Sequence, residues 1–157
     1  MQDGNKYESA LRIIGDCLEP FSAGKNFPFF GFGACMNETK DTPYLQRMNS
    51  IEGVNYAFPL NGNQDDPSIV GLENLIETYR SNVEKTSPGR PCYLAPILRN
   101  IQGMINKKEL VYHYILLLVA GPNVDMDQTR EVCVELSHYP CQITVIGIGN
   151  GDFSELE

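Results

Sequence analysis

The chain has 157 residues and a mass of 17.6 kDa, the usual size of one domain. We therefore predict a single domain over residues 1–157. Hydrophobic residues make up 42% and charged residues 20%, which is typical of a globular protein and not of a disordered one. The net charge of −8 argues against nucleic acid and anionic membrane surfaces as direct partners, because both need a basic face.

Five cysteines are present, an odd number with no Cys-x-x-Cys spacing. Two of them, Cys17 and Cys133, fall within helical patterns. The set predicts reduced, mostly buried thiols of a cytoplasmic protein and not a disulfide framework or a zinc site. The first six residues contain no apolar stretch, so we expect no signal peptide. The longest apolar run, Ile115 to Ala120, is far too short to cross a bilayer.

The first third of the chain combines a helical pattern with short apolar runs. Apolar residues recur at helical spacing over residues 7–18, and Pro20 ends the pattern. The aromatic run Phe27–Ala34 predicts a short buried strand. Residues 35–54 are polar and irregular, which indicates a surface loop or insertion. Residues 55–60 can form a short strand, and residues 61–66 have the composition of a turn.

The rest of the chain alternates helices and strands. Asp66 and Pro67 are expected to open a helix that reaches Val83. The other predicted elements are a loop at 87–91, a helix over 94–105 with Pro96 in its first turn, a strand over 110–120, a helix from Asp125 or Asp127 to about His138, and a strand over 141–147. Both late strands are apolar throughout, which predicts burial on both faces. This order predicts an α/β fold with a parallel or mixed sheet and helices on both faces.

No motif in the chain predicts catalysis. The glycine run Gly147–Gly151 only partly resembles a nucleotide-binding loop, because Asp152 stands where the last glycine is needed. Asn123, Asp125 and Asp127 resemble half of a calcium loop, but the required glycine and glutamate are missing, so helix capping explains them better. A cysteine hydrolase that uses Cys92 or Cys133 remains a minor alternative.

Several stretches, taken in order, resemble a known family. They are Tyr7–Gly15, Phe27–Ala34, Phe58–Asn63, Gly71-Leu72 with Tyr79, Ala95–Ile97, Asp125–Thr129, and Ile146–Gly149 with Asp152-Phe153. Together they are similar to the von Willebrand factor A-like domain of copines. The plant RING ubiquitin ligases with a copine-like domain are a more distant resemblance. The resemblance covers nearly the whole chain and implies a Rossmann-like A-type domain with a mostly parallel sheet.

The same resemblance implies a surface for partner proteins at the carboxyl ends of the strands, often built around a metal-ion-dependent adhesion site. This chain lacks the expected ligand residue in each of the three loops that form that site in the family. The serine-containing first loop is absent, Cys92 matches a threonine, and Ala120 matches an aspartate. An alanine cannot ligate a metal, and a single cysteine is too soft for magnesium or calcium. We therefore expect no metal ligand set and no cofactor.

The first strand of the family's sheet also has no counterpart here. In the family it lies centrally, between the strands that match Phe27–Ala34 and Val111–Ala120. Its loss leaves unpaired backbone groups, which are costly when buried. Three outcomes are open: the two neighbours pair directly, another chain supplies a strand, or the chain is a fragment of a longer protein. We expect marginal stability or self-association through the open sheet edges.

The resemblance, together with the tendency of α/β folds to bind at strand ends, predicts a non-catalytic protein–protein interaction module. The predicted contact residues are Asn61, Gly62, Cys92, Gly121, Asn123 and Asp125. We expect an unidentified protein partner, no nucleic acid and no direct membrane insertion, in the cytoplasm or at the inner face of the plasma membrane through partners. The alternative is a fragment or isoform of a calcium-dependent phospholipid-binding copine. Paired lipid-binding domains do not fit within these residues.

Overall fold

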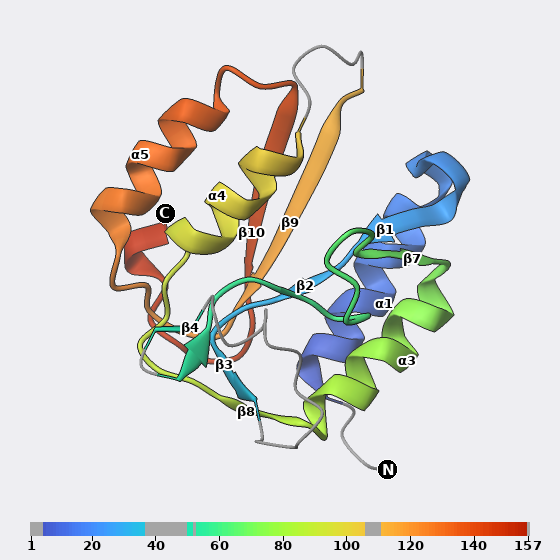
Figure 1. Ribbon diagram of the computed structural model, residues 1–157, viewed down its shortest axis with the longest axis horizontal. Coiled ribbons are helices and arrows are strands. Elements are labelled where there is room, and N and C mark those ends of the chain that lie inside the picture. The colour runs from blue at the N-terminus through green and yellow to red at the C-terminus, as the bar shows by residue number, and fades with distance from the viewer. Residues whose placement is uncertain (1–4, 37–49, 52, 106–110, 157) are drawn as a thin grey trace. The chain divides into compact units, whose positions relative to one another are not determined.

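A computed structural model describes residues 5–36, 50–51, 53–105 and 111–156. The chain divides into two compact units, Met1–Arg90 and Pro91–Glu157, which are taken separately below. Figure 1 shows the helices and strands of both. The prediction of one domain over residues 1–157 stays a prediction. None of the described helices is both long enough and apolar enough to cross a membrane.

Two packed helices form one side of the first unit. Helix α1 spans Lys6–Leu18, and the side chain of Asn5 accepts a hydrogen bond from the Tyr7 amide at its start. Helix α3 spans Leu72–Val83 and packs against α1 (Figure 1). Gly15 permits this close approach, because a Cβ atom there would lie 2.3 Å from the Leu72 side chain. The predicted first helix is thus confirmed, including its end before Pro20.

The strands of the first unit are all short. They are β1 (Asn26–Pro28), β2 (Phe30–Gly31), β3 (Ala34–Met36), β4 (Ser50–Ile51), β5 (Val54–Asn55), β6 (Phe58–Pro59), β7 (Ser68–Val70) and β8 (Thr86–Pro88). Strand β1 pairs with β7 and β2 with β6, while β4, β5, β3 and β8 form one sheet in that order. Every one of these pairings is antiparallel. The expectation of a mostly parallel sheet is therefore not met in this unit.

Three predicted elements of the first unit need correction. The run Phe27–Ala34 is divided among β1, β2 and β3, because Pro28 lacks an amide hydrogen and Gly33 turns the chain with a φ of 67°. Residues 55–60 likewise divide between β5 and β6. The predicted loop at 87–91 begins within β8.

The predicted start of a helix at Asp66 and Pro67 is also wrong. Residues 68–70 form β7, and α3 begins only after Gly71, whose φ is 83°. The Asp66 side chain accepts a hydrogen bond from the Ser68 amide at 3.1 Å, as in an Asx turn. The same residue types open helices and form such turns, and here the antiparallel pairing with β1 selects the turn.

The predicted loop over residues 35–54 is described only at its ends. Residues 37–49 and 52 lie outside the described residues. The described ends of this predicted loop form strands. Cys35 belongs to β3, Ser50 and Ile51 form β4, and Val54 begins β5. Strand β5 pairs with both β3 and β4, so this part of the chain turns back on itself as an antiparallel sheet.

The second unit has the parallel pairing that the sequence predicts. It contains α4 (Ala95–Met104), β9 (His113–Val119), α5 (Met126–Leu136), β10 (Cys141–Gly147) and a short 3₁₀ turn (Ser154–Leu156). Strands β9 and β10 run parallel, with His113 beside Cys141 and Val119 beside Gly147. Helix α4 packs against α5, and Gln102 donates a hydrogen bond to Glu135 at 2.8 Å. The α/β character is therefore confirmed.

Burial in the second unit is one-sided. In β9 the side chains of Ile115, Leu117 and Val119 are buried, whereas Leu116 and Leu118 between them are half-buried. Strand β10 has no fully buried residue. The prediction that both strands are buried on both faces is therefore wrong.

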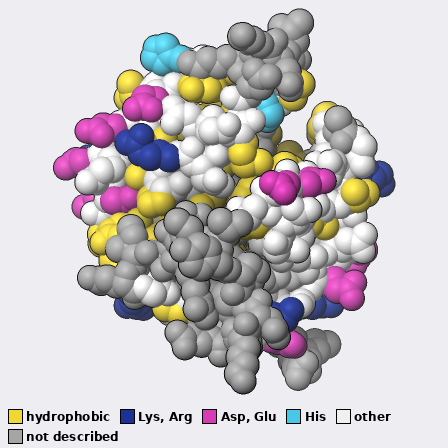
Figure 2. All heavy atoms as spheres, viewed as in Figure 1, with side chains coloured by type: hydrophobic (Ala, Val, Ile, Leu, Met, Phe, Trp, Pro, Cys, Tyr) yellow, Lys and Arg dark blue, Asp and Glu magenta, His cyan; other side chains and the backbone are white. Residues whose placement is uncertain are grey.

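The outer face of α5 is acidic, and Figure 2 shows magenta side chains gathered over this helix around a blue one.

The cysteines also differ from expectation in part. All five are free thiols, as predicted. Cys17 and Cys133 are exposed, however, and the other three are half-buried, so the prediction of mostly buried thiols is wrong. Helical spacing places a residue within a helix but leaves open which face meets solvent.

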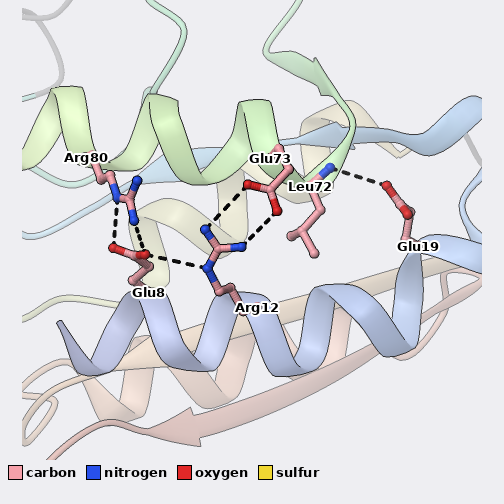
Figure 3. Close-up of polar contacts among 6 residues, drawn as sticks. All are labelled: Glu8, Arg12, Glu19, Leu72, Glu73 and Arg80. Atoms are coloured by element: carbon pink, nitrogen blue, oxygen red, sulfur yellow. Dashed lines mark hydrogen bonds and ion pairs between the residues drawn. The ribbon is translucent and has the colours of Figure 1, made fainter. Parts of the chain in front are cut away.

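A row of alternating positive and negative side chains joins α1 to α3 (Figure 3). The Arg80 Nε atom donates to Glu8 Oε2 at 3.0 Å, and Arg12 Nη1 donates to Glu73 Oε1 at 2.8 Å. Arg12 also lies 3.6 Å from Glu8, one turn away on α1. Glu19 extends the link, because its carboxylate accepts a hydrogen bond from the Leu72 amide at 3.3 Å. The hydrogen bond from Arg80, aided by the nearby positive charges, lowers the pKa of Glu8.

We expect this pairing to make stability depend on acidity. A carboxylate whose pKa is lower in the folded state stabilises above its unfolded pKa, and the effect is lost as the pH falls through the folded pKa. Glu8→Gln should therefore reduce the urea midpoint at neutral pH, and the difference from wild type should vanish at acidic pH. High salt should reduce the difference as well, because the pair is at the surface. Glu84→Gln, at an exposed carboxylate after α3, is the control. A Glu8→Gln difference that is independent of pH would contradict the argument.

Candidate functional site

The predicted contact residues fall in both units. Asn61 and Gly62 lie in the turn after β6, in the first unit. Cys92, Gly121, Asn123 and Asp125 lie in the second unit, in the segments that precede α4 and α5. Within the second unit these two segments are in contact, because the Val124 amide donates a hydrogen bond to the Cys92 carbonyl at 3.1 Å. The structure thus brings Cys92 together with Asn123 and Asp125.

The carboxylate of Asp125 connects the starts of two helices. It was expected to cap its own helix, and it does occupy the N-cap position of α5, but its side chain makes no capping bond there. Instead Oδ1 accepts a hydrogen bond from the Leu94 amide and Oδ2 accepts one from the Ala95 amide, each at 2.9 Å. Leu94 is the N-cap of α4 and cannot supply such a bond itself. Asp125 therefore satisfies backbone donors that the first turn of α4 leaves unpaired.

Two further polar side chains complete this buried cluster. Thr129, one turn along α5, donates from its hydroxyl to Asp125 Oδ1 at 3.2 Å. Asn123 Nδ2 donates to that same hydroxyl at 3.1 Å. Asn123, Asp125 and Thr129 are all buried. Among the described residues, Asn123 Oδ1 has no hydrogen-bond partner. Sequence analysis did not single out Thr129, although its spacing of four residues from Asp125 on a helix is a usable signal.

Cys92 lies at the edge of this cluster with a weakly acidic thiol. Burial raises its pKa, and the negative charge of Asp125 raises it further. Burial also raises the pKa of Cys133, on α5. A thiol with a raised pKa is mostly protonated at neutral pH and is a poor nucleophile. This environment gives no support to either cysteine as a catalytic nucleophile.

The loop after β9 offers few side-chain atoms that could bind a metal ion. Ala120 stands at the strand end with a methyl side chain. Its carbonyl faces Gly151, where an added Cβ atom would lie only 2.7 Å away. The glycine run 147–151 therefore serves as a close-packed strand-end loop. Over residues 5–36, 50–51, 53–105 and 111–156, no three His, Cys, Asp or Glu side chains form a group that could hold a metal ion.

The loop between Asn123 and Asp125 exposes one apolar side chain that sequence analysis did not identify. Val124 is 59% exposed, although the residues on both sides of it are buried. Its amide is fixed by the Cys92 carbonyl, so its position is defined by the same contacts that order the cluster. Single exposed apolar side chains are common on protein surfaces, and Ile13, Val70 and Val134 are more exposed than Val124. Val124 is distinguished by its place between the predicted contact residues Asn123 and Asp125.

The turn in the first unit is ordered by its own side chains. Asn61 Nδ2 donates to the carbonyls of Asp66 and Ser68, and its Oδ1 accepts from the Asn63 amide. Gly62 has a φ of 75°, a conformation that favours glycine. These bonds explain the shape of the turn.

We expect Asp125→Asn to destabilise the start of α4. The substituted amide would present an N–H group to one of the two backbone donors, which loses a hydrogen bond and leaves a buried donor unpaired. The loss should be about 1–3 kcal/mol in the free energy of unfolding. Urea unfolding measures it, and amide exchange at Leu94 and Ala95 should accelerate. Asp127→Asn, at an exposed side chain in the first turn of α5, is the control. Equal losses in the two variants would contradict this role.

The same contact predicts the reactivity of Cys92. Iodoacetamide at neutral pH should label Cys92 more slowly than the exposed Cys17. Asp125→Asn removes a negative charge, which should lower the pKa of Cys92 and accelerate its labelling. The labelling rate of Cys133 should stay unchanged in this variant, because burial and not the charge of Asp125 raises its pKa. Rapid labelling of Cys92 in the wild-type chain would contradict the argument.

Comparison with known proteins identifies the family. The copine family model matches residues 1–157, the whole chain. Protein BONZAI 1 of Arabidopsis thaliana is 28% identical over 158 residues, which cover 98% of this chain and 25% of that protein. The chain therefore spans about a quarter of the length of this curated relative. The match over all residues agrees with the resemblance found in the sequence, and the chain belongs to the copine family.

Proposed function

We propose that this chain is a non-catalytic module that binds another protein through the loops before α4 and α5. The proposed contact consists of the exposed Val124 with the half-buried Cys92 and Gly121, and the predicted contact residues Asn123 and Asp125 form its buried base. These five residues are called here the strand-end surface. The observation that carries the proposal is the exposed Val124 side chain, which stands on a buried and internally hydrogen-bonded base. A von Willebrand factor A-type fold is part of this proposal, and its support among the described residues is the parallel pairing of β9 with β10 beside α4 and α5.

Binding at the strand-end surface is proposed to need no divalent ion and no other cofactor. Ala120 offers no ligand atom at the position where the family resemblance implies an aspartate. Cys92 offers a soft, mostly protonated thiol where it implies a threonine. Both oxygens of Asp125 already accept backbone hydrogen bonds. The remaining acceptor, Asn123 Oδ1, is a single neutral oxygen and is a weak basis for a cation site.

Asn61 and Gly62 are proposed as a further contact region in the first unit. The turn is exposed and is held rigid by the Asn61 side chain, so a partner meets a preformed shape. The partner itself is a protein of unknown identity. A net charge of −8 disfavours nucleic acid. The proposed location is the cytoplasm, or the inner face of the plasma membrane through partners.

The second candidate function is that of a piece of a calcium-dependent, phospholipid-binding copine. The observation that favours it is that the chain covers 25% of BONZAI 1. In that case the chain is one module of a longer protein that attaches to membranes through other segments. Coding sequence for two calcium-binding lipid domains upstream of residue 1 would support this candidate, and its absence from the transcript would count against it.

The test is capture of partners from a cell lysate by the immobilised chain. Val124→Lys should reduce the set of captured proteins, because a charge replaces the apolar contact on the strand-end surface. Val134→Lys is a matched control, since Val134 is 64% exposed on α5 and lies outside that surface. Calcium, magnesium or chelator should leave capture unchanged.

Thermal melts separate the two parts of the proposal. A rise in melting temperature with calcium or magnesium would show that a cation binds the folded chain, and the ion-independent part would then be wrong. Equal capture by the Val124→Lys and Val134→Lys variants would instead show that the contact lies elsewhere on the chain.

A further inference from the structure

The chain contains two Asn-Gly pairs, Asn61-Gly62 and Asn150-Gly151. In such a pair the glycine amide nitrogen can attack the asparagine side-chain carbonyl, because no Cβ atom on the glycine hinders its approach. Both asparagines are exposed to solvent. The two pairs differ in the hydrogen bonds that hold them, so local structure determines which of them can react.

Asn61 is held at every polar group that this reaction uses. Its Nδ2 atom donates to two backbone carbonyls of its own turn, and its Oδ1 atom accepts a hydrogen bond from the Asn63 amide. The Gly62 amide, which would be the attacking group, donates to the Pro59 carbonyl at 3.1 Å. The turn must therefore open before Asn61 can react, and opening breaks these hydrogen bonds.

Asn150 and Gly151 have no such restraints. In the part of the chain that the structure describes, neither the Asn150 side chain nor the Gly151 amide forms a hydrogen bond. Residues 148–153 lie outside any helix or strand, so no regular backbone hydrogen bonding holds the pair. The attacking nitrogen and the carbonyl that it would attack are therefore both unpaired.

Packing explains why glycine follows Asn150. A Cβ atom on Gly151 would lie 2.7 Å from the Ala120 carbonyl oxygen and 3.0 Å from the Gly121 Cα atom. Both of these are backbone atoms, which cannot move aside as the end of a flexible side chain can. The strand-end loop thus requires glycine at position 151, and this requirement creates the reactive pair.

We propose that Asn150 deamidates spontaneously through a succinimide formed with Gly151, whereas the turn of Asn61 protects that residue. Hydroxide removes the Gly151 amide proton, and the nitrogen bonds to Cγ of Asn150. The bond from Cγ to Nδ2 then breaks, and Nδ2 takes a proton from water and leaves as ammonia.

Water opens the succinimide in one of two ways. Cleavage of the bond from the ring nitrogen to Cγ gives aspartate at position 150. Cleavage of the bond from the ring nitrogen to the main-chain carbonyl carbon gives isoaspartate, in which the main chain runs through Cγ. Either product adds one negative charge to the net −8 of the chain. Isoaspartate also adds one carbon atom to the main chain, which displaces Gly151 from its contact with Ala120.

The experiment incubates the folded chain at neutral and mildly alkaline pH and follows both Asn-Gly pairs by peptide mapping and mass spectrometry. Asn150 should deamidate at least about tenfold faster than Asn61, because breaking only two hydrogen bonds of the turn slows the reaction by about that factor. The rate at Asn150 should rise with pH, since the attacking nitrogen must lose its proton. Fragmentation that distinguishes the two acids should find both aspartate and isoaspartate at position 150.

The unfolded chain is the matched control for the effect of structure. In guanidinium chloride above the unfolding midpoint, the hydrogen bonds of the turn are lost, and the two asparagines should deamidate at similar rates. Asn150→Gln is the control for the chemistry, because it keeps an exposed side-chain amide but must close a larger ring. The folded variant should therefore lose the rapid deamidation at position 150, and ion exchange should show no early gain of negative charge.

Three results would overturn the proposal. One is deamidation of Asn61 and Asn150 at similar rates in the folded chain. Another is an Asn150 that stays intact in the folded chain while both pairs react in the unfolded chain, which would show that the loop keeps its side chain away from the Gly151 amide. The last is aspartate without isoaspartate at position 150, which would indicate direct hydrolysis of the side-chain amide. The inference concerns the loop after β10 and does not depend on the proposed partner surface.

Discussion

The carboxylate of Asp125 is the contact on which the second unit depends. It belongs to the start of α5 but binds the first backbone donors of α4, so it joins two helices that are separated by β9 along the chain. A helix start without such acceptors leaves buried amides unpaired, which costs more than the hydrogen bond itself contributes. The neighbouring Val124 amide donates to the Cys92 carbonyl, and burial together with the charge of Asp125 raises the pKa of Cys92.

This arrangement is the reason why the proposed partner contact needs no metal ion. In a metal-dependent site, hard oxygen ligands must remain free for the ion and for the partner. Here the buried polar side chains are largely used to bind the chain's own backbone and one another. Asn123 donates to the Thr129 hydroxyl at the base, and Asn123 Oδ1 is the atom of this cluster that has no hydrogen-bond partner among the described residues. What the loop offers outward is shape and an apolar side chain, which suits a protein surface.

Sequence reasoning located what depends on local periodicity. Helix α1, helix α4 and strand β10 lie where their patterns place them, because amphipathic spacing and Pro20 or Pro96 are local signals. Sequence reasoning failed where contacts between residues far apart in the sequence determine the local structure. Asp66 forms a turn because β7 pairs with β1, and Asp125 bonds to α4 because the fold brings that helix near. Neither the direction of a capping side chain nor the exposed face of a helix can be derived from spacing.

The aromatic ring of Phe153 fills the space that side chains at positions 147 and 151 would occupy, where the chain has glycine. A Cβ atom on Gly147 would lie 2.8 Å from this ring, and one on Gly151 would lie 3.2 Å from it. The three positions therefore share one volume. In an evolutionary comparison they should covary, so that a side chain at 147 or 151 coincides with a small residue at 153. The length of the loop between 147 and 153 should also be fixed, since an insertion would move the ring away from both glycines.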